Sequence, residues 1–206
     1  GGLPLIMGAS GYHLGEMRDW LGHIGRAGVS LAGLLLPAPC YVRPSQAGLL
    51  AWFQDLAEAS PAPLVVYDIP YRTGATLTLD TLRQLAAHPR IRAVKDCGGD
   101  GAKTQALIRD GQLAVLAGED AQMLGTLALG GTGAIAACAQ VHPERFVAVY
   151  RAIQHDDLNA ARQHWHALVP LVQTLFAEPN PAPLKALLAS QGWCANHLRL
   201  PMTPAS

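Results

Sequence analysis

Lys95 is one of only three lysines in this chain, and its setting is suited to chemistry. It follows the largely apolar run 91–94, which predicts a buried β-strand. At the carboxyl end of a barrel strand, a side chain points into the mouth where active sites form. Partial desolvation there lowers the pKa of an amine and leaves free base to attack a ketone carbonyl. A strand-end lysine is more often a salt-bridge partner, so both interpretations stay open.

The other two lysines have settings typical of the protein surface. Lys103 lies just beyond the polar, glycine-rich stretch 98–101, in the helix that follows it. Lys185 lies on a predicted helix after two prolines. We therefore predict that both amines are exposed to solvent.

Tyr67 and Arg72 are the other candidates for chemistry near a predicted strand end. Tyr67 ends the apolar run 64–66, and a phenol there can relay protons because its hydroxyl both donates and accepts. Arg72 lies in the following loop and could bind a substrate carboxylate through two parallel hydrogen bonds. The alternatives are a rim tyrosine whose ring packs in the core and an ordinary surface arginine.

Short apolar runs alternate along the chain with stretches of helical periodicity. The predicted strands are 3–7, 32–36, 64–67, 91–95, 113–117 and 133–137. This alternation is typical of βα units and of a parallel sheet that is buried on both faces. The sequence lacks the phosphate-binding motifs GxGxxG and GxxxxGK[ST], so an α/β fold of the (β/α)8 TIM-barrel type is favoured over an open nucleotide-binding sheet.

The predicted barrel is incomplete at its amino terminus. Six strands cannot close a barrel of eight, and residue 1 is a glycine that precedes the first strand by only a few positions. We expect that a segment with two βα units is missing before it. After His142-Pro143 the strands cease, and helical periodicity continues to about Gly192. The sequence thus predicts a partial catalytic barrel over 1–155 and a C-terminal helical domain over 156–206.

The composition excludes several classes of partner. Lys and Arg together number 15, as do Asp and Glu, and no basic run is present, which argues against nucleic acid or an anionic membrane. The 4 cysteines contain no CxxC pair, so we expect neither a zinc site nor a disulfide framework. No apolar stretch reaches the roughly 18 residues of a membrane span. A cytoplasmic protein with small-molecule substrates is expected.

Two motifs together resemble the signature of the dihydrodipicolinate synthase family of class I pyruvate aldolases. The first is Tyr67-Asp68-Ile69-Pro70-Tyr71-Arg72-Thr73-Gly74, and at the family's spacing it is followed by Val94-Lys95-Asp96. Further segments match in the same order, at 39–45, 118–120, 130–135, 178–185 and 198–204. The resemblance covers essentially the whole chain.

The resemblance implies a lyase that condenses pyruvate with L-aspartate 4-semialdehyde to 4-hydroxy-tetrahydrodipicolinate, in lysine and diaminopimelate biosynthesis. By position, Lys95 matches the lysine that forms the Schiff base with pyruvate, and Tyr67 matches the phenol that relays protons to it. Tyr41 matches a second tyrosine of the relay, which reaches in from a neighbouring subunit. A homo-oligomer, either a dimer or a tetramer, is therefore expected.

The resemblance also implies substrate-binding residues. Arg72 matches an arginine that binds the carboxylate of the second substrate, and Gly118 and Ile135 match positions whose backbone lines the pyruvate pocket. No metal or organic cofactor is expected, because the protonated imine is itself the electron sink.

The chain departs from the family's pattern at several places. The family has two adjacent tyrosines here, and the first of them, which packs at the subunit contact, is replaced by Cys40. Val42 and Asp68 replace asparagines that are common in the family. The Gly-Thr-Thr-Gly-Glu-type loop, which in the family supplies a relay hydroxyl and holds the pyruvate carboxylate, is absent from these residues, and we expect that the family's final helix is cut short. Subunit assembly and loop hydrogen bonding are the properties that these departures put in question.

Two other functions remain open at this point. One is a related aldolase, such as an N-acetylneuraminate lyase or a 2-keto-3-deoxy-sugar-acid aldolase, although Arg72-Thr73-Gly74 weighs against a polyol substrate. The other is an inactive remnant or structural subunit, which the expected missing segment makes plausible.

Overall fold

A computed structural model describes residues 2–206 and divides the chain into two compact units. The first unit contains the described residues up to Leu116 together with Leu129–Thr132. The second contains Ala117–Ala128 and Gly133–Ser206. Each unit has a hydrophobic core of its own.

The strands form one sheet in which they follow one another in sequence order, as the sequence predicted. They are β1 (Ile6–Gly8), β2 (Gly33–Pro37), β3 (Leu64–Asp68), β4 (Ile91–Asp96), β5 (Ala114–Ala117) and β6 (Gly133–Ala134). β1 to β4 pair in parallel. This sequential, parallel order is the arrangement of a (β/α)8 barrel, so the predicted fold class is confirmed.

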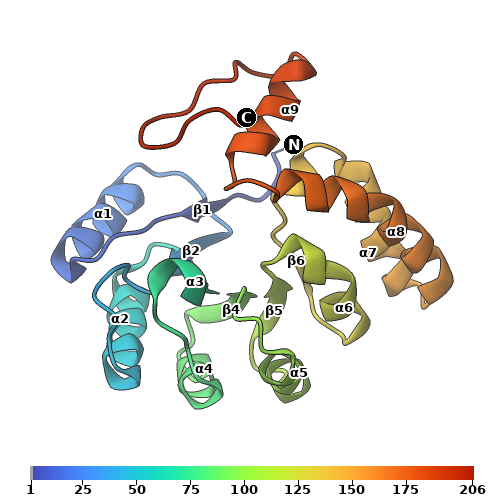
Figure 1. Cartoon of the computed structure of the whole chain (residues 1–206). Coiled ribbons are helices and arrows are strands. Elements are labelled where there is room, and N and C mark those ends of the chain that lie inside the picture. The colour runs from blue at the N-terminus through green and yellow to red at the C-terminus, as the bar shows by residue number, and fades with distance from the viewer. Residues whose placement is uncertain (1) are drawn as a thin grey trace. The chain divides into compact units, whose positions relative to one another are not determined.

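The helices of the first unit flank these strands, as Figure 1 shows for α1, α2, α4 and α5. They are α1 (Leu14–Arg26), α2 (Gln46–Ala59), the short α3 (Pro70–Thr73), α4 (Leu79–Ala86) and α5 (Gly101–Asp110). α2 begins after Ser45, whose hydroxyl accepts a hydrogen bond from the Gly48 amide. α5 ends at Gly111, which adopts the left-handed conformation with φ of 64°.

The core of the first unit forms between one face of the sheet and its helices. Alternate strand residues such as Leu64, Val66 and Val94 are fully buried on that face, where Leu49 and Phe53 of α2 belong to the same cluster. The opposite face of β3 and β4 carries Tyr67 and Lys95, because successive side chains of a strand point to opposite faces.

The second unit is mostly helical. It contains the 3-10 helices η1 (Asp120–Gln122) and η2 (Cys138–Gln140) and the helices α6 (Met123–Ala128), α7 (Pro143–Gln154), α8 (Leu158–Leu175) and α9 (Ala182–Ser190). Pro143 occupies the first turn of α7. No strand follows β6 in the described residues, which also agrees with the sequence. The predicted domain boundary at residue 155 stays a prediction.

Two predicted strands differ from the structure by more than one residue at an end. The prediction began the first strand at Leu3, but β1 begins at Ile6 and Leu3 is 86% exposed. Pro4 lacks the amide hydrogen that a ladder needs, so regular pairing starts after it. The sixth strand was predicted to reach residue 137, but β6 ends at Ala134. The Asp120 carboxylate accepts hydrogen bonds from the amides of Ala137 and Cys138, which diverts them from a strand ladder.

Among residues 2–206, the longest apolar helices fall short of what crossing a membrane requires.

The fully buried position of Leu49 gives a stability prediction. We expect Leu49→Ala to lower the free energy of unfolding by about 2–5 kcal/mol, because it removes buried methyl groups and leaves a cavity. Leu3→Ala is the matched control, and it should change that free energy by less than about 0.5 kcal/mol because Leu3 is exposed. Urea denaturation of the two variants measures both values. Equal effects would contradict the burial that the structure gives to α2.

Candidate active site

Tyr67 and Lys95 lie opposite each other at the carboxyl ends of two adjacent strands. The register of β3 and β4 pairs Tyr67 with Lys95. The Lys95 Nζ atom lies 4.2 Å from the centre of the Tyr67 ring, within the range of a cation–π contact. The structure therefore brings together the two side chains that the sequence singled out for chemistry.

Cys97 is a neighbour of this pair that the sequence reasoning missed. Its thiol donates to the Tyr67 hydroxyl over 3.9 Å, and the residue is buried. The signal was available in the sequence, since Cys97 follows Lys95 by two positions and alternate residues of an extended segment share a face. Any proton that moves through the Tyr67 phenol thus moves beside a thiol.

Arg72 lies in α3, where it borders two hollows in the first unit. One has a volume of about 290 Å³, and its lining includes Tyr67, Leu35 and Cys40 together with Arg72. The other, of about 420 Å³, is lined by Arg72, Tyr41, Arg43, Tyr71, Thr73 and Gly74. The guanidinium of Arg72 also lies 5.6 Å from the centre of the Tyr71 ring. An arginine with this placement can meet an anionic ligand in the same hollow as the Tyr67 phenol.

Tyr41 has an unusual backbone and an open side chain. Its φ of 75° lies in the left-handed region, as does the φ of 46° at Arg43, and such values are uncommon for residues with a side chain. The Tyr41 side chain is 93% exposed. Its predicted part in the active site of a neighbouring subunit stays a prediction.

Gly118 and Ile135 belong to the second unit, which is described by itself. There the Ile135 amide donates to the Ala117 carbonyl over 2.9 Å. The buried Asp120 carboxylate holds the segment just beyond it through the amides of Ala137 and Cys138, at 3.1 and 2.7 Å. This local order fixes the backbone at Ile135, while the role of both residues in a pyruvate pocket stays a prediction.

Cys138 is a buried thiol beside Asp120. Burial, followed by the hydrogen bond and the charge of Asp120, raises its pKa far above the ordinary thiol range. The thiol is therefore protonated at neutral pH, and Cys138 is not a nucleophile in this state.

The predicted exposure of Lys103 was wrong. Its side chain is 5% exposed, and its Nζ atom lies 2.5 Å from the Asp68 carboxylate, itself 1% exposed. The polar, glycine-rich sequence before Lys103 suggested a position exposed to solvent, but its partner Asp68 lies in a different βα unit. Burial raises the pKa of Asp68, and the hydrogen bond and charge of Lys103 oppose that rise.

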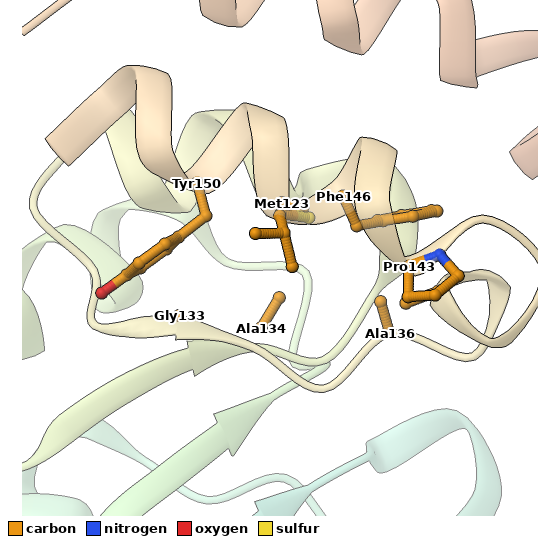
Figure 2. Close-up of a pocket in the computed structure, with 9 residues that line it drawn as sticks. Met123, Gly133, Ala134, Ala136, Pro143, Phe146 and Tyr150 are labelled. Atoms are coloured by element: carbon orange, nitrogen blue, oxygen red, sulfur yellow. The ribbon is translucent and has the colours of Figure 1, made fainter. Parts of the chain in front are cut away.

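The second unit contains a separate apolar pocket of about 320 Å³ (Figure 2). β6 forms one wall, and Phe146 and Tyr150 of α7 face it with Met123 between them. Among its lining residues, Tyr150 alone carries an ionisable group. This pocket offers contact with apolar groups rather than acid–base chemistry.

No three His, Cys, Asp or Glu side chains in residues 2–206 are grouped so that they could hold a metal ion.

The comparison with known proteins assigns the chain to a family. The profile of the Dihydrodipicolinate synthetase family matches residues 1–206. The chain belongs to this family. It is 35% identical to the 4-hydroxy-tetrahydrodipicolinate synthase of Methanosarcina mazei, over 99% of this chain and 70% of that protein. It is 37% identical to the enzyme of that name from Haloarcula marismortui, over 99% of this chain and 67% of that protein.

Solved structures of this family share the fold. Dihydrodipicolinate synthase from Aquifex aeolicus superposes with a TM-score of 0.93 at 29% identity, over 99% of this chain and 70% of that one. The chloride-inhibited synthase from Acinetobacter baumannii, crystallised with pyruvate, gives a TM-score of 0.93 at 32% identity over the same shares. These matches support the interpretation of the six strands as part of a (β/α)8 barrel.

The burial of Lys103 can be tested by competitive labelling of amines. We expect an acylating reagent to modify Lys103 roughly a hundredfold more slowly than Lys185, because exposing Lys103 breaks a buried ion pair at a cost of about 3–5 kcal/mol. Peptide mass spectrometry after brief labelling measures the two rates. In concentrated urea the two rates should converge, and equal rates in the folded protein would contradict the buried position.

Proposed function

We propose that this chain is a Schiff-base lyase that condenses pyruvate with L-aspartate 4-semialdehyde to give 4-hydroxy-tetrahydrodipicolinate, a step of lysine and diaminopimelate biosynthesis. The observation that carries the proposal is the Lys95 amine, held 4.2 Å from the centre of the Tyr67 ring at the ends of two paired strands. Family membership and the names of the relatives support the same reaction.

Lys95 is the nucleophile in this proposal. Its neutral amine attacks the ketone carbon of pyruvate, and loss of water from the adduct leaves a protonated imine. The imine draws electrons from the neighbouring methyl group, which then loses a proton and becomes an enamine. The enamine carbon forms the new bond to the aldehyde carbon of the second substrate, whose oxygen takes up a proton and becomes a hydroxyl. The amino group of that substrate then attacks the imine carbon, which displaces the Lys95 amine and closes the ring of the product.

Tyr67 moves protons in these steps. Attack by the Lys95 amine, loss of water from the adduct and the later displacement of Lys95 each need a proton to be delivered or removed close to that amine. The Tyr67 hydroxyl can do both because it is a donor and an acceptor. Tyr41 of a neighbouring subunit would continue this relay to solvent, which requires a dimer or a tetramer.

Arg72 is the binding residue for the carboxylate of the second substrate. It shares a hollow with Tyr67, so a semialdehyde held by Arg72 lies on the side of the site where the phenol is. Gly118 and Ile135 contribute backbone groups to the pyruvate pocket in this proposal. The chemistry uses no metal or organic cofactor, and a cytoplasmic location suits an enzyme of amino-acid biosynthesis.

The comparisons favour the synthase over the two alternatives. The relatives at 35% and 37% identity are named as 4-hydroxy-tetrahydrodipicolinate synthases, rather than as lyases for sialic acid or sugar acids. The cationic Arg72 beside the hollow also suits a carboxylate better than a polyol. An active lyase requires an amine and a proton relay side by side, and Lys95 and Tyr67 are placed in this way. This placement disfavours a purely structural subunit.

Reductive trapping with pyruvate and borohydride tests the role of Lys95. We expect a stable adduct on Lys95 and none on Lys103 or Lys185, because an imine needs a reachable amine that can lose its proton. Peptide mass spectrometry locates the adduct. An adduct confined to Lys103 or Lys185 would remove Lys95 from the mechanism.

A substitution at Arg72 separates the two half-reactions. We expect Arg72→Ala to lower turnover with aspartate semialdehyde by roughly tenfold to a hundredfold, since a charge-assisted contact contributes about 1.5–3 kcal/mol. The rate of pyruvate trapping should change much less. Arg109→Ala, which alters an exposed arginine of α5, is the matched control. Equal losses in trapping and in turnover would count against the assignment of Arg72 to the second substrate.

A further inference from the structure

A buried polar network lies behind the ends of β3 and β4. Asp68 and Asp96 each follow a proposed catalytic residue by one position, so their side chains point away from the site and toward the helices. Both carboxylates are buried. The mechanism above uses neither of them.

The Asp68 carboxylate is held by two groups from two other segments. Its Oδ2 atom accepts a hydrogen bond from Lys103 Nζ at 2.5 Å, and its Oδ1 atom accepts one from the Leu77 amide at 3.3 Å. Lys103 Nζ also donates to the Leu77 carbonyl at 3.1 Å. The end of β3 is thereby tied both to the first turn of α5 and to the segment that leads into α4.

The Asp96 carboxylate is held by the residue next to Lys103. Its Oδ2 atom accepts a hydrogen bond from the Thr104 hydroxyl, and its Oδ1 atom accepts one from the Gly98 amide at 2.8 Å. Lys103 and Thr104 are consecutive residues of α5, so one turn of this helix holds the ends of both strands. The Cys97 amide joins the two ends directly, because it donates to the Asp68 carbonyl at 2.8 Å.

Gly98 leaves space for this network. A Cβ atom at Gly98 would lie 2.7 Å from Lys103 Nζ and 3.0 Å from both Asp68 Oδ2 and Asp96 Oδ1. The 2.7 Å contact is shorter than a Cβ atom tolerates and the two 3.0 Å contacts are tight, and the atoms concerned are held in place by hydrogen bonds. The absence of a side chain at this position is therefore a condition for the ion pair to form.

We propose that the Asp68–Lys103 ion pair is a positioning device for the Tyr67–Lys95 pair. This proposal rests on the proposed function, because the groups that the ion pair positions are the imine-forming amine and its proton relay. The pair fixes the end of β3 to the helix that also holds the end of β4, so Tyr67 and Lys95 keep their relative placement. A lone Asp68 carboxylate in this buried space would draw in water or shift the strand end, and a displacement of about 1 Å at reacting groups can cost a hundredfold in rate.

Three variants form a double-mutant cycle with the unaltered chain. They are the single variants Lys103→Met and Asp68→Asn and the double variant Asp68→Asn/Lys103→Met. The measured quantity is the maximal rate of pyruvate trapping on Lys95 per folded molecule, with its dependence on pyruvate concentration. We expect Lys103→Met to lower the maximal rate by roughly tenfold to a hundredfold, with little change in the half-saturating pyruvate concentration. The double variant should recover most of the loss, because it carries no unpaired buried charge.

Arg83→Met is the matched control for charge. The Arg83–Asp110 pair joins α4 to the other end of α5, with Nε and Oδ2 at 2.7 Å and with side chains 43% and 22% exposed. Its loss should leave the trapping rate within about twofold, since exposed pairs contribute little. If Lys103→Met matches this control per folded molecule and only its unfolding temperature falls, the pair is structural alone and the proposal is overturned. The proposal is also overturned if the fold loss of trapping rate in the double variant equals the product of the fold losses in the two single variants.

Gly98→Ala disturbs the same network without removing a charge. Neither Gly98 nor Gly101 has a positive φ, and a Cβ at Gly101 meets nothing within 4 Å, so Gly101→Ala is the control. We expect Gly98→Ala to slow trapping in the manner of Lys103→Met and Gly101→Ala to leave it unchanged. Equal rates for the two alanine variants would contradict the proposal.

Hydrogen exchange at the Cys97 amide separates failure of this proposal from failure of the proposed function. If the unaltered chain traps no pyruvate, the lyase assignment fails, but the amide still reports the link between the strand ends. Under the proposal, Lys103→Met and Gly98→Ala lower the protection of this amide far more than Arg83→Met and Gly101→Ala do. Unchanged protection in Lys103→Met would overturn the positioning role whatever the trapping result.

Discussion

The register between β3 and β4 is the constraint on which the candidate site depends. In this register Tyr67 lies opposite Lys95, and Asp68 lies opposite Asp96. Because the side-chain period of a strand is two, a slip of one residue would turn the Lys95 amine toward the helices and bring a carboxylate to the open face. The chemistry therefore tolerates no error in the pairing of these two strands.

This register is reached through an irregularity earlier in the pair. Leu64 lies opposite Ile91, but the next residue, Val65, lies opposite Ala93, so β4 contains one more residue than β3 over this stretch. Without that extra residue, uninterrupted pairing from Leu64 onward would place Val94, instead of Lys95, opposite Tyr67. Bulges of this kind re-aim side chains near functional sites. Val66 and Val94 pair after this irregularity, and both are buried in the core on the helix side. Their burial holds β3 and β4 in the register that places Tyr67 opposite Lys95.

The sequence predicted the parts of the fold that have a local signal. Strand order and the strand-end positions of Tyr67 and Lys95 follow from hydrophobic periodicity, and the structure agrees with both. The errors have non-local causes. Lys103 was predicted to be exposed because its neighbours in sequence are polar, whereas the Asp68 carboxylate that pairs with it lies in another βα unit. The early end of β6 depends likewise on hydrogen bonds to the distant Asp120.

The buried Asp68–Lys103 ion pair contributes to the orientation of the strand end more than to the stability of the fold. Burial raises the pKa of Asp68 even though Lys103 opposes the rise, so the loss of hydration outweighs the compensation. Apolar side chains of similar volume would stabilise such a space as well or better. They would not specify orientation, because dispersion contacts are non-directional, whereas Lys103 donates along fixed directions to a carboxylate and a carbonyl. A strand end whose side chain must meet a reacting group needs that kind of constraint, and the polar network supplies it one residue beyond Tyr67.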